Sequence, residues 1–236
     1  MFEPRPVDVL AVGAHPDDVE LGCGGTLLRL KSLGRRTGVV DLTRGELGTR
    51  GTMETRALES RRAAALLGLD FRLNLGLRDG NLSPDEESRL ALIRVIRKCR
   101  PKLVLTHSKW GHPDHGKASI LVEEAVHHAG LAAIDTSQQR FRPRRIACWT
   151  HFDEPVVPHV GVDISDHYEQ KEHALKAFAS QLHRPDSREP ATYLSDPTFL
   201  ERIRSFHMHV GSLVGCSLAE GFLMARPPRI GDLADC

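Results

Sequence analysis

Short apolar runs alternate with longer amphipathic segments as far as about residue 130 of the chain. The apolar runs predict buried strands at 7–13, 37–42, 69–75 and 103–106. The segments between and after them have helical periodicity and predict helices at 22–33, 54–67, 83–100 and 116–128. A serine at position 83 followed by proline is typical of a helix start. Strand and helix therefore alternate regularly in this part of the chain.

This alternation predicts an α/β fold. Buried strands joined by helices form right-handed βαβ units and a parallel sheet. We expect a Rossmann-like, doubly wound, mostly parallel sheet whose first five strands have the order 3-2-1-4-5. Shorter strands at 145–150 and 160–164 and helices at 166–181 and 198–210 complete the pattern. We expect a single domain over 1–236, with a core at about 7–185 and a C-terminal helix and tail at 186–236.

Composition restricts the possible functions. The 236 residues carry 32 Lys and Arg against 31 Asp and Glu, so the formal net charge is +1. Nucleic-acid-binding domains usually have a clear basic excess, and aromatic residues, at 5%, offer little for base stacking. The unusual feature is the 13 histidines, because imidazole is the commonest metal ligand and a frequent proton carrier. We therefore expect metal or acid–base chemistry and no nucleic-acid partner.

Cysteine usage and the apolar runs bear on localisation. The five cysteines form no CxxC pair and are odd in number, which favours a reducing compartment over a disulfide framework. The sequence shows neither a signal peptide nor an apolar run of about 18 residues. We therefore expect a cytoplasmic protein without a membrane partner.

Two polar clusters follow predicted strands. Segment 15–18, with the sequence HPDD, comes directly after the first strand, and segment 112–115, HPDH, comes after the fourth strand and a short loop. In the expected strand order these two strands are neighbours, so the clusters meet at the carboxyl edge of the sheet, where ligands bind. A catalytic zinc site needs three protein ligands and one open position, and both N and O donors are acceptable. Each cluster offers two candidate ligands three residues apart: His15 with Asp18, and His112 with His115.

Each cluster also has a simpler interpretation as a turn. A lone His-Pro-Asp segment is usually a turn, but two such clusters after strands in a His-rich chain favour a metal site. Asp17 is an additional carboxylate, which is suited to act as the general base for a metal-activated water. Asp114 is either a turn residue or a hydrogen-bond partner that fixes the tautomer of a histidine in its own motif.

The first cluster is part of a longer motif. Residues 14–26, AHPDDVELGCGGT, resemble the signature of the LmbE-like, or PIG-L, zinc-dependent N-acetylglucosamine deacetylases. Residues 112–116, HPDHG, resemble that family's second motif. The segments 45–56, 162–165 and 180–181 are similar to the bacillithiol-pathway branch, whose substrate is N-acetylglucosaminylmalate. The resemblance spans most of the chain, to about residue 222.

The resemblance implies roles for individual residues. It implies His15, Asp18 and His115 as ligands of a zinc ion, with Fe²⁺ as the other possible metal. It further implies Asp17 as the general base, His112 as the group near the oxyanion and Arg56 as a cation on the substrate side.

Three more side chains follow the second strand. The planar fork of arginine suits a substrate carboxylate, so Arg50, like Arg56, is a candidate for binding an anionic substrate group. Glu46 is a candidate for holding sugar hydroxyls. We therefore expect these side chains at the substrate end of the site.

The sequence thus predicts a zinc-dependent N-deacetylase of an N-acetylglucosamine conjugate, with N-acetylglucosaminylmalate as the leading candidate substrate. Another conjugate or a chito-oligosaccharide is the alternative, and the resemblance implies a homo-oligomer, a trimer or hexamer. A nucleotide-binding oxidoreductase is the competing class, but Leu27 replaces the third glycine of its GxGxxG motif. A non-catalytic metal module is a third class, against which the spare carboxylate of Asp17 argues.

Overall fold

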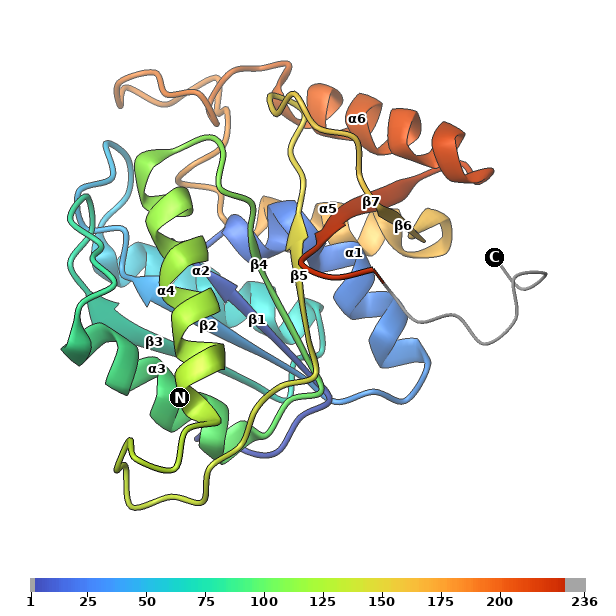
Figure 1. Ribbon diagram of the computed structural model, residues 1–236. Helices are drawn as coiled ribbons and strands as arrows, with labels where there is room; N and C mark the ends of the chain where they lie inside the picture. Colours follow the sequence, from blue (N-terminus) through green and yellow to red (C-terminus); the bar gives the residue numbers. More distant parts are fainter. Residues whose placement is uncertain (1–2, 228–236) are drawn as a thin grey trace.

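The computed structural model describes residues 3–227 and contains one sheet of seven strands in the order β3-β2-β1-β4-β5-β7-β6 (Figure 1). The strands are β1 (Val9–Gly13), β2 (Thr37–Thr43), β3 (Phe71–Leu77), β4 (Leu103–His107), β5 (Arg145–Trp149), β6 (Val160–Asp163) and β7 (Ala219–Met224). The first five pair in parallel, whereas β7 runs antiparallel to both β5 and β6. The predicted α/β class and the predicted order 3-2-1-4-5 are both confirmed.

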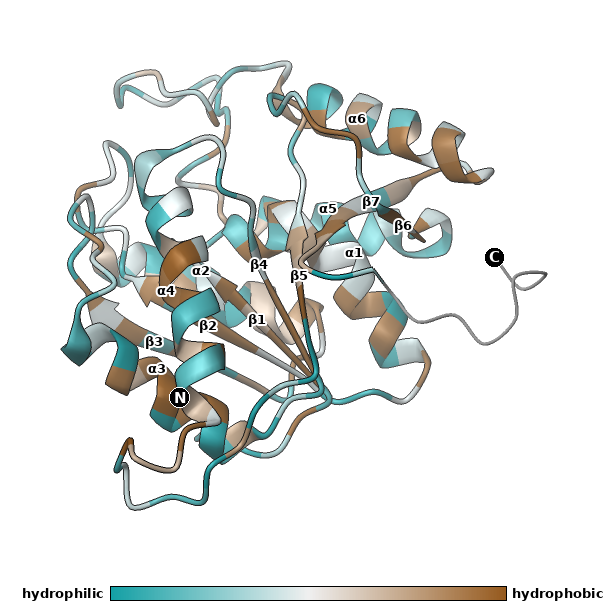
Figure 2. Cartoon of the chain, viewed as in Figure 1, coloured by the Kyte–Doolittle hydropathy of each residue, from teal (hydrophilic) through white to brown (hydrophobic). Residues whose placement is uncertain are grey.

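Helices cover both faces of the sheet. Helices α3 (Glu86–Cys99) and α4 (Pro113–Ala129) pack together on one face, and α1 (Asp18–Ser32), α2 (Met53–Leu66) and α5 (Tyr168–Lys176) lie on the other. A last helix, α6 (Phe199–Val214), packs beside β6 and β7. Figure 2 shows the central strands mostly in the apolar colour, whereas the helices carry both apolar and polar residues.

Strand β1 lies at the centre of the core and explains the continuous apolar run in the sequence. Leu10 and Val12 pack toward the side of α3 and α4, while Val9 and Ala11 pack toward the side of α1. All of these side chains are buried, as expected for a parallel strand covered on both faces. Because β1 is held between β2 and β4, its carboxyl end is fixed where the direction of strand order reverses.

Some boundaries differ from the predicted ones. Helix α3 begins at Glu86 with Asp85 as its N-cap, and the Asp85 side chain accepts a hydrogen bond from the Ser88 backbone N–H. The predicted start at position 83 was therefore wrong. The predicted helix at 166–181 is a 3₁₀ turn (Ser165–His167) followed by α5, which ends at Lys176.

Strand β7 was not predicted, because a glutamate interrupts its apolar pattern. Glu220 is fully buried and accepts hydrogen bonds from the backbone N–H groups of Gly25 and Thr26 in α1. Its carboxylate also forms an ion pair with Lys171, which is likewise fully buried. A buried ion pair between two distant segments has no local sequence signal. Strand β7 therefore lies within the segment 186–236 that was predicted as a C-terminal helix and tail. The end of that segment, 228–236, lies outside the described residues.

None of the helices within residues 3–227 is both long and apolar enough to cross a bilayer.

Candidate active site

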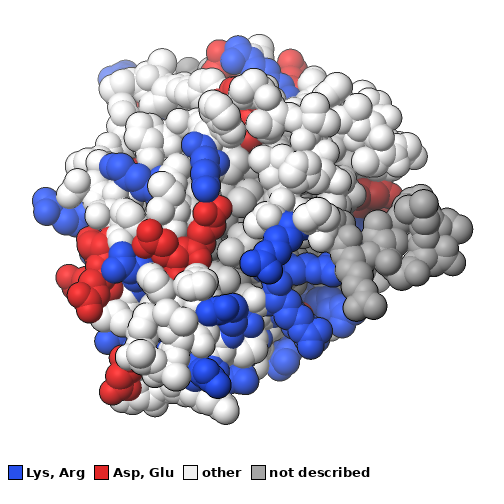
Figure 3. Space-filling model, in the orientation of Figure 1, with Lys and Arg blue, Asp and Glu red and all other residues white. Residues whose placement is uncertain are grey.

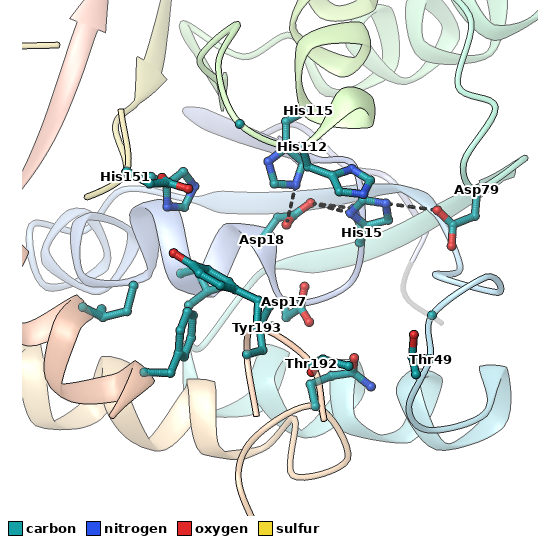
Figure 4. A pocket seen from close by; sticks show the side chains of 18 of the residues that line it. His15, Asp17, Asp18, Thr49, Asp79, His112, His115, His151, Thr192 and Tyr193 are labelled. Carbon is teal, nitrogen blue, oxygen red and sulfur yellow. Dashed lines mark hydrogen bonds and ion pairs between the residues drawn. The ribbon is translucent and has the colours of Figure 1, made fainter. Parts of the chain in front are cut away.

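A cavity of about 600 Å³ opens at the carboxyl edge of the sheet, where β1 and β4 are neighbours (Figure 4). The loops after β1, β2, β3, β4 and β5 line it, together with Arg56, Gln181 and several side chains between 192 and 203. Both sequence clusters therefore reach the same cavity, as predicted. His15, Asp17 and Asp18 enter from β1, and His112 and His115 enter from the start of α4.

The turn after β1 has a strained conformation at Asp17. Its φ is 112°, a value that residues other than glycine rarely adopt and that costs on the order of 1–3 kcal/mol. The Asp17 carbonyl accepts a hydrogen bond from Leu21 N–H, and α1 begins at Asp18, directly after Asp17. The backbone N–H of His15 donates to the Asp18 carboxylate over 2.7 Å. This turn places both carboxylates on the cavity wall.

Asp18 is the centre of the predicted ligand set. Its Oδ1 lies 3.2 Å from His115 Nε2, and its Oδ2 lies 3.4 Å from His15 Nδ1. Two donors at about 2.0–2.1 Å from one tetrahedral ion are separated by about 3.4 Å. These two separations are close to that value, and the N and O donors suit a zinc-like ion.

Metal-capable side chains extend beyond these three residues. The donor atoms of His15, His112 and His115 lie within 4.8 Å of one another, and so do those of Asp18, His107 and His115. A third set at the same spacing joins His15 to two carboxylates, Asp79 and Asp114. Because the three sets share His15 or His115, they form one continuous polar cluster.

Two residues that the sequence analysis missed support the ligands from behind. Asp79 Oδ1 lies 3.0 Å from His15 Nε2, so the carboxylate holds the ring nitrogen that faces away from Asp18. His107 Nε2 lies 3.1 Å from Asp18 Oδ2. A carboxylate behind a histidine ligand fixes its orientation and tautomer. Asp79 follows β3 and His107 ends β4, so their positions at carboxyl ends of strands were the available signal.

Asp114 contributes to the same support from an unexpected side. Its Oδ2 lies 3.6 Å from His15 Nε2 and accepts a hydrogen bond from the Gly80 backbone N–H. The predicted contact was with a histidine of its own motif. The structure instead places its side chain against His15 of the first motif.

The electrostatics of the cluster favour a cation. Burial lowers the pKa of His15, but Asp18 and Asp79 outweigh this effect and raise the pKa to about 11. Burial would raise the pKa of Asp18, yet His115, His107 and His15 hold it well below the usual value for a carboxyl group. The carboxylates thus stabilise positive charge at the position where the donor set would hold a metal ion.

Asp17 has a different environment from Asp18. Burial raises the pKa of Asp17 to about 7, although the nearby Arg56 opposes this shift. A general base is most effective when its pKa lies near the working pH. The two adjacent carboxylates therefore have separate properties: Asp18 stays ionised among the imidazoles, and Asp17 is poised to exchange a proton.

Arg56 lines the cavity, but its guanidinium is already engaged. Nη2 lies 3.0 Å from Asp17 Oδ2 and also donates to the Pro16 carbonyl. The side chain is buried, and Nη1 donates to the Gly45 carbonyl over 3.4 Å. The structure therefore places Arg56 as the ion-pair partner of Asp17, in contrast to the expected partner of a substrate carboxylate.

Replacing Arg56 with alanine is expected to lower kcat/KM by about 10–150-fold on charged and neutral substrates alike, since a hydrogen bond to a charged group contributes about 1.5–3 kcal/mol. The reason is that the substitution removes the ion-pair partner of Asp17, so the loss of activity does not depend on whether the substrate carries a carboxylate. Parallel assays on N-acetylglucosaminylmalate and N-acetylglucosamine measure this. Arg61→Ala, on the exposed side of the same helix, is the matched control. A loss confined to the malate conjugate would show that Arg56 binds the substrate anion.

Arg50 and Glu46 lie outside the cavity lining. Arg50 is buried and donates to the Ser180 carbonyl and the Ser187 hydroxyl, so it ties the loop after β2 to the segment after α5. Glu46 accepts hydrogen bonds from the backbone N–H groups of Arg44 and Asp79. The structure brings neither side chain to the position expected of a substrate-binding group.

His112 lies at the mouth of the cavity and caps α4. Its Nδ1 accepts a hydrogen bond from the Asp114 backbone N–H over 3.2 Å. Burial and the neighbouring His15 and His115 lower its pKa, so the ring is neutral near pH 7. A neutral ring that accepts at Nδ1 carries its proton on Nε2. Nε2 is therefore a hydrogen-bond donor available to a bound molecule.

Comparison with known proteins identifies the family of the chain. Residues 10–126 match the family model described as PIG-L: GlcNAc-PI de-N-acetylase. The chain is 33% identical over 230 residues to a diacetylchitobiose deacetylase from Thermococcus kodakarensis, covering 90% of this chain and 81% of the relative. It is 31% identical to a probable N-acetyl-α-D-glucosaminyl L-malate deacetylase 2 from Bacillus anthracis, over 74% of this chain and 81% of that one.

The fold is also shared with a solved structure. The conserved protein TT1542 from Thermus thermophilus superposes with a TM-score of 0.87 at 38% identity, covering 96% of this chain and 98% of that chain. The chain belongs to the PIG-L, or LmbE-like, family of deacetylases. The predicted family is thereby confirmed.

Proposed function

We propose that this chain hydrolyses the N-acetyl amide of an N-acetylglucosamine conjugate, with a divalent metal ion held by His15, Asp18 and His115. The observation that carries the proposal is the pair of adjacent carboxylates: Asp18 lies between two imidazoles, and Asp17 lies next to it with a pKa of about 7. A purely structural metal site has no use for the second carboxylate. Hydrolysis of an amide needs a base at this position.

The residues of the chain have separate tasks in this reaction. A divalent ion, zinc or iron(II), would supply Lewis-acid polarisation of the acetyl carbonyl and of the attacking water. Asp17 accepts the proton of that water, and Arg56 holds the Asp17 carboxylate in place. His112 offers its Nε2–H to the carbonyl oxygen as negative charge develops there. Asp79 and Asp114 keep the His15 ring oriented toward Asp18.

Two conjugates are candidate substrates. N-acetylglucosaminylmalate, the substrate in the bacillithiol-pathway branch, is supported by the branch motifs and by the named relative from Bacillus anthracis. A chito-oligosaccharide is supported by the relative from Thermococcus kodakarensis, which matches over more of the chain. The same soluble amino-sugar conjugates are the expected partners. The cytoplasmic location and the homo-oligomer stay predictions from the sequence.

A substrate panel tests the proposal directly. We expect the purified chain to release one acetate and one free amine per molecule from N-acetylglucosamine and its conjugates. Acetate is measured enzymatically and the amine by a fluorogenic reagent, with N-acetyl-lysine peptide as a control amide of different chemistry. Turnover of the peptide with none of the sugars would contradict the proposal, as would the absence of acetate from every substrate.

A further inference from the structure

One side of the cavity differs in character from the His and Asp cluster. Six apolar or aromatic side chains line it: Leu21, Phe152, Tyr193, Leu194, Phe199 and Ile203. We call Phe152, Tyr193 and Phe199 the aromatic wall. We propose that the aromatic wall binds the group attached to the amino sugar and selects uncharged groups with an apolar face, such as a second pyranose ring. This inference rests on the proposed deacetylase function and narrows its substrate.

The three rings of the aromatic wall contact one another in a fixed arrangement. The rings of Phe152 and Tyr193 stack, with centroids 6.0 Å apart and planes 15° apart. Tyr193 meets Phe199 edge to face at 5.6 Å and 70°, and Phe152 meets Phe199 at 6.4 Å and 63°. Such offset and edge-to-face pairs are the preferred geometries of aromatic side chains. The wall is thus preorganised.

The wall is anchored at one end and open at the other. Phe199 is only 3% exposed and packs in a hydrophobic cluster with Leu21 and Ile203. Tyr193 is 50% exposed, and Figure 4 shows it across the cavity from His112 and His115. An exposed aromatic ring that is held by a buried one gives a bound molecule an apolar surface at little entropic cost.

The charges in the cavity argue against an anionic group at this position. Among the described residues, Arg56 is the one Lys or Arg that lines the cavity, and it is paired with Asp17. Five carboxylates line the same space: Asp17, Asp18, Asp79, Asp153 and Glu154. Two of them, Asp153 and Glu154, directly follow Phe152 of the aromatic wall in the sequence. A malate group at the aromatic wall, with two carboxylates of its own, would therefore meet repulsion, and no unpaired Lys or Arg among the described residues that line the cavity offsets it.

One group of exposed basic side chains lies at the amino end of the sheet. On the face drawn in Figure 3, Lys and Arg side chains concentrate below the starts of the strands in Figure 1. Arg36, Lys102 and Arg144 directly precede β2, β4 and β5. Backbone hydrogen bonds link them at this edge: Asp8 N–H donates to the Arg36 carbonyl, Lys102 N–H to the Asp8 carbonyl and Arg144 N–H to the Lys102 carbonyl. This positive charge lies at the amino edge, away from the cavity. It supplies no attraction for an anion at the aromatic wall.

The test compares substrates that differ only in the attached group. We measure kcat/KM for N-acetylglucosamine, N,N′-diacetylchitobiose and N-acetylglucosaminylmalate with the wild-type chain and with Tyr193→Ala. The wild type is expected to prefer diacetylchitobiose over the malate conjugate. Tyr193→Ala is expected to lower the ratio of kcat/KM for diacetylchitobiose to that for N-acetylglucosamine by roughly 10-fold. The reason is that the second sugar ring loses its apolar contact with the Tyr193 ring.

Two further variants separate this role from others. Tyr193→Phe keeps the ring and is expected to keep the ratio of kcat/KM values. If Tyr193→Phe instead lost as much kcat/KM on all substrates as Tyr193→Ala, the role would belong to the hydroxyl and the inference would be overturned. Leu33→Ala, at an exposed apolar residue at the end of α1, is the control and leaves all rates unchanged. A preference for the malate conjugate, or an unchanged ratio in Tyr193→Ala, would also overturn it. Failure of the deacetylase proposal gives a different result, no acetate from any of the three sugars.

Discussion

The variant His115→Ala is expected to lose its metal ion and with it nearly all deacetylase activity, while the fold persists. His115 Nε2 lies 3.2 Å from Asp18 Oδ1 and provides one of three proposed ligands. A site with two remaining ligands holds a divalent ion far more weakly, and without the ion the acetyl carbonyl is not polarised. Metal content by mass spectrometry and acetate release by enzymatic assay give the two readouts. Circular dichroism reports on the fold.

A second histidine of the same helix provides the matched control. His127 is exposed near the end of α4, and the alanine variant there removes an imidazole of the same helix without touching the cavity. This control is expected to keep both metal and activity. Full metal occupancy in His115→Ala would exclude His115 from the ligand set.

The variant Asp17→Asn is expected to lower kcat by about 10²–10⁴-fold, the usual contribution of a general base, without loss of the metal ion. Asparagine has nearly the same shape and tolerates a positive φ, so the strained turn at φ 112° is retained. What the variant loses is the ability of the carboxylate to accept a proton. A steady-state rate assay beside a metal analysis tests both halves of this expectation.

Asp153→Asn serves as the comparison for Asp17. Asp153 is an exposed carboxylate that lines the same cavity but follows β5. Its amide variant is expected to stay within a few-fold of the wild type with N-acetylglucosamine. Activity of Asp17→Asn in that same range would assign the base to another group.

The sequence predicted the part of the site that topology determines. The two clusters follow β1 and β4, and parallel pairing of these strands brings their carboxyl ends together. Hydrophobic patterning is enough to place such strands, because each is buried on both faces and reads as an apolar run. For this reason the strand order and the meeting of His15, Asp18 and His115 in one cavity followed from the sequence. Their role as metal ligands stays a prediction.

The contacts that the sequence did not reveal join distant segments of the chain. Asp79 contacts His15 from 64 positions away, and Arg56 turns to Asp17 from 39 positions away. Neither contact has a local pattern, since a carboxylate after a strand or an arginine on a helix is usually solvated. The position of Arg56 in particular depends on the strained turn at Asp17, which sequence periodicity does not predict.

The aromatic wall illustrates the same limit. Phe152 follows β5, Tyr193 lies in an irregular segment, and Phe199 begins α6. Their rings come together only because α6 packs beside β7, the strand that the sequence pattern did not predict. The motif residues of the polar half were therefore predictable, while Asp79, His107 and the half proposed to choose the substrate required the tertiary structure.

The central claim is that this chain is a deacetylase whose activity depends on one metal ion at His15, Asp18 and His115. The most direct test is to remove metal with a chelator, dialyse, and return Zn²⁺ in small steps while acetate release from N-acetylglucosamine is measured. We predict that the depleted chain is inactive and that activity rises linearly and saturates at about one ion per chain. Undiminished activity in the depleted chain, or an activity that does not return as the ion binds, would contradict the claim.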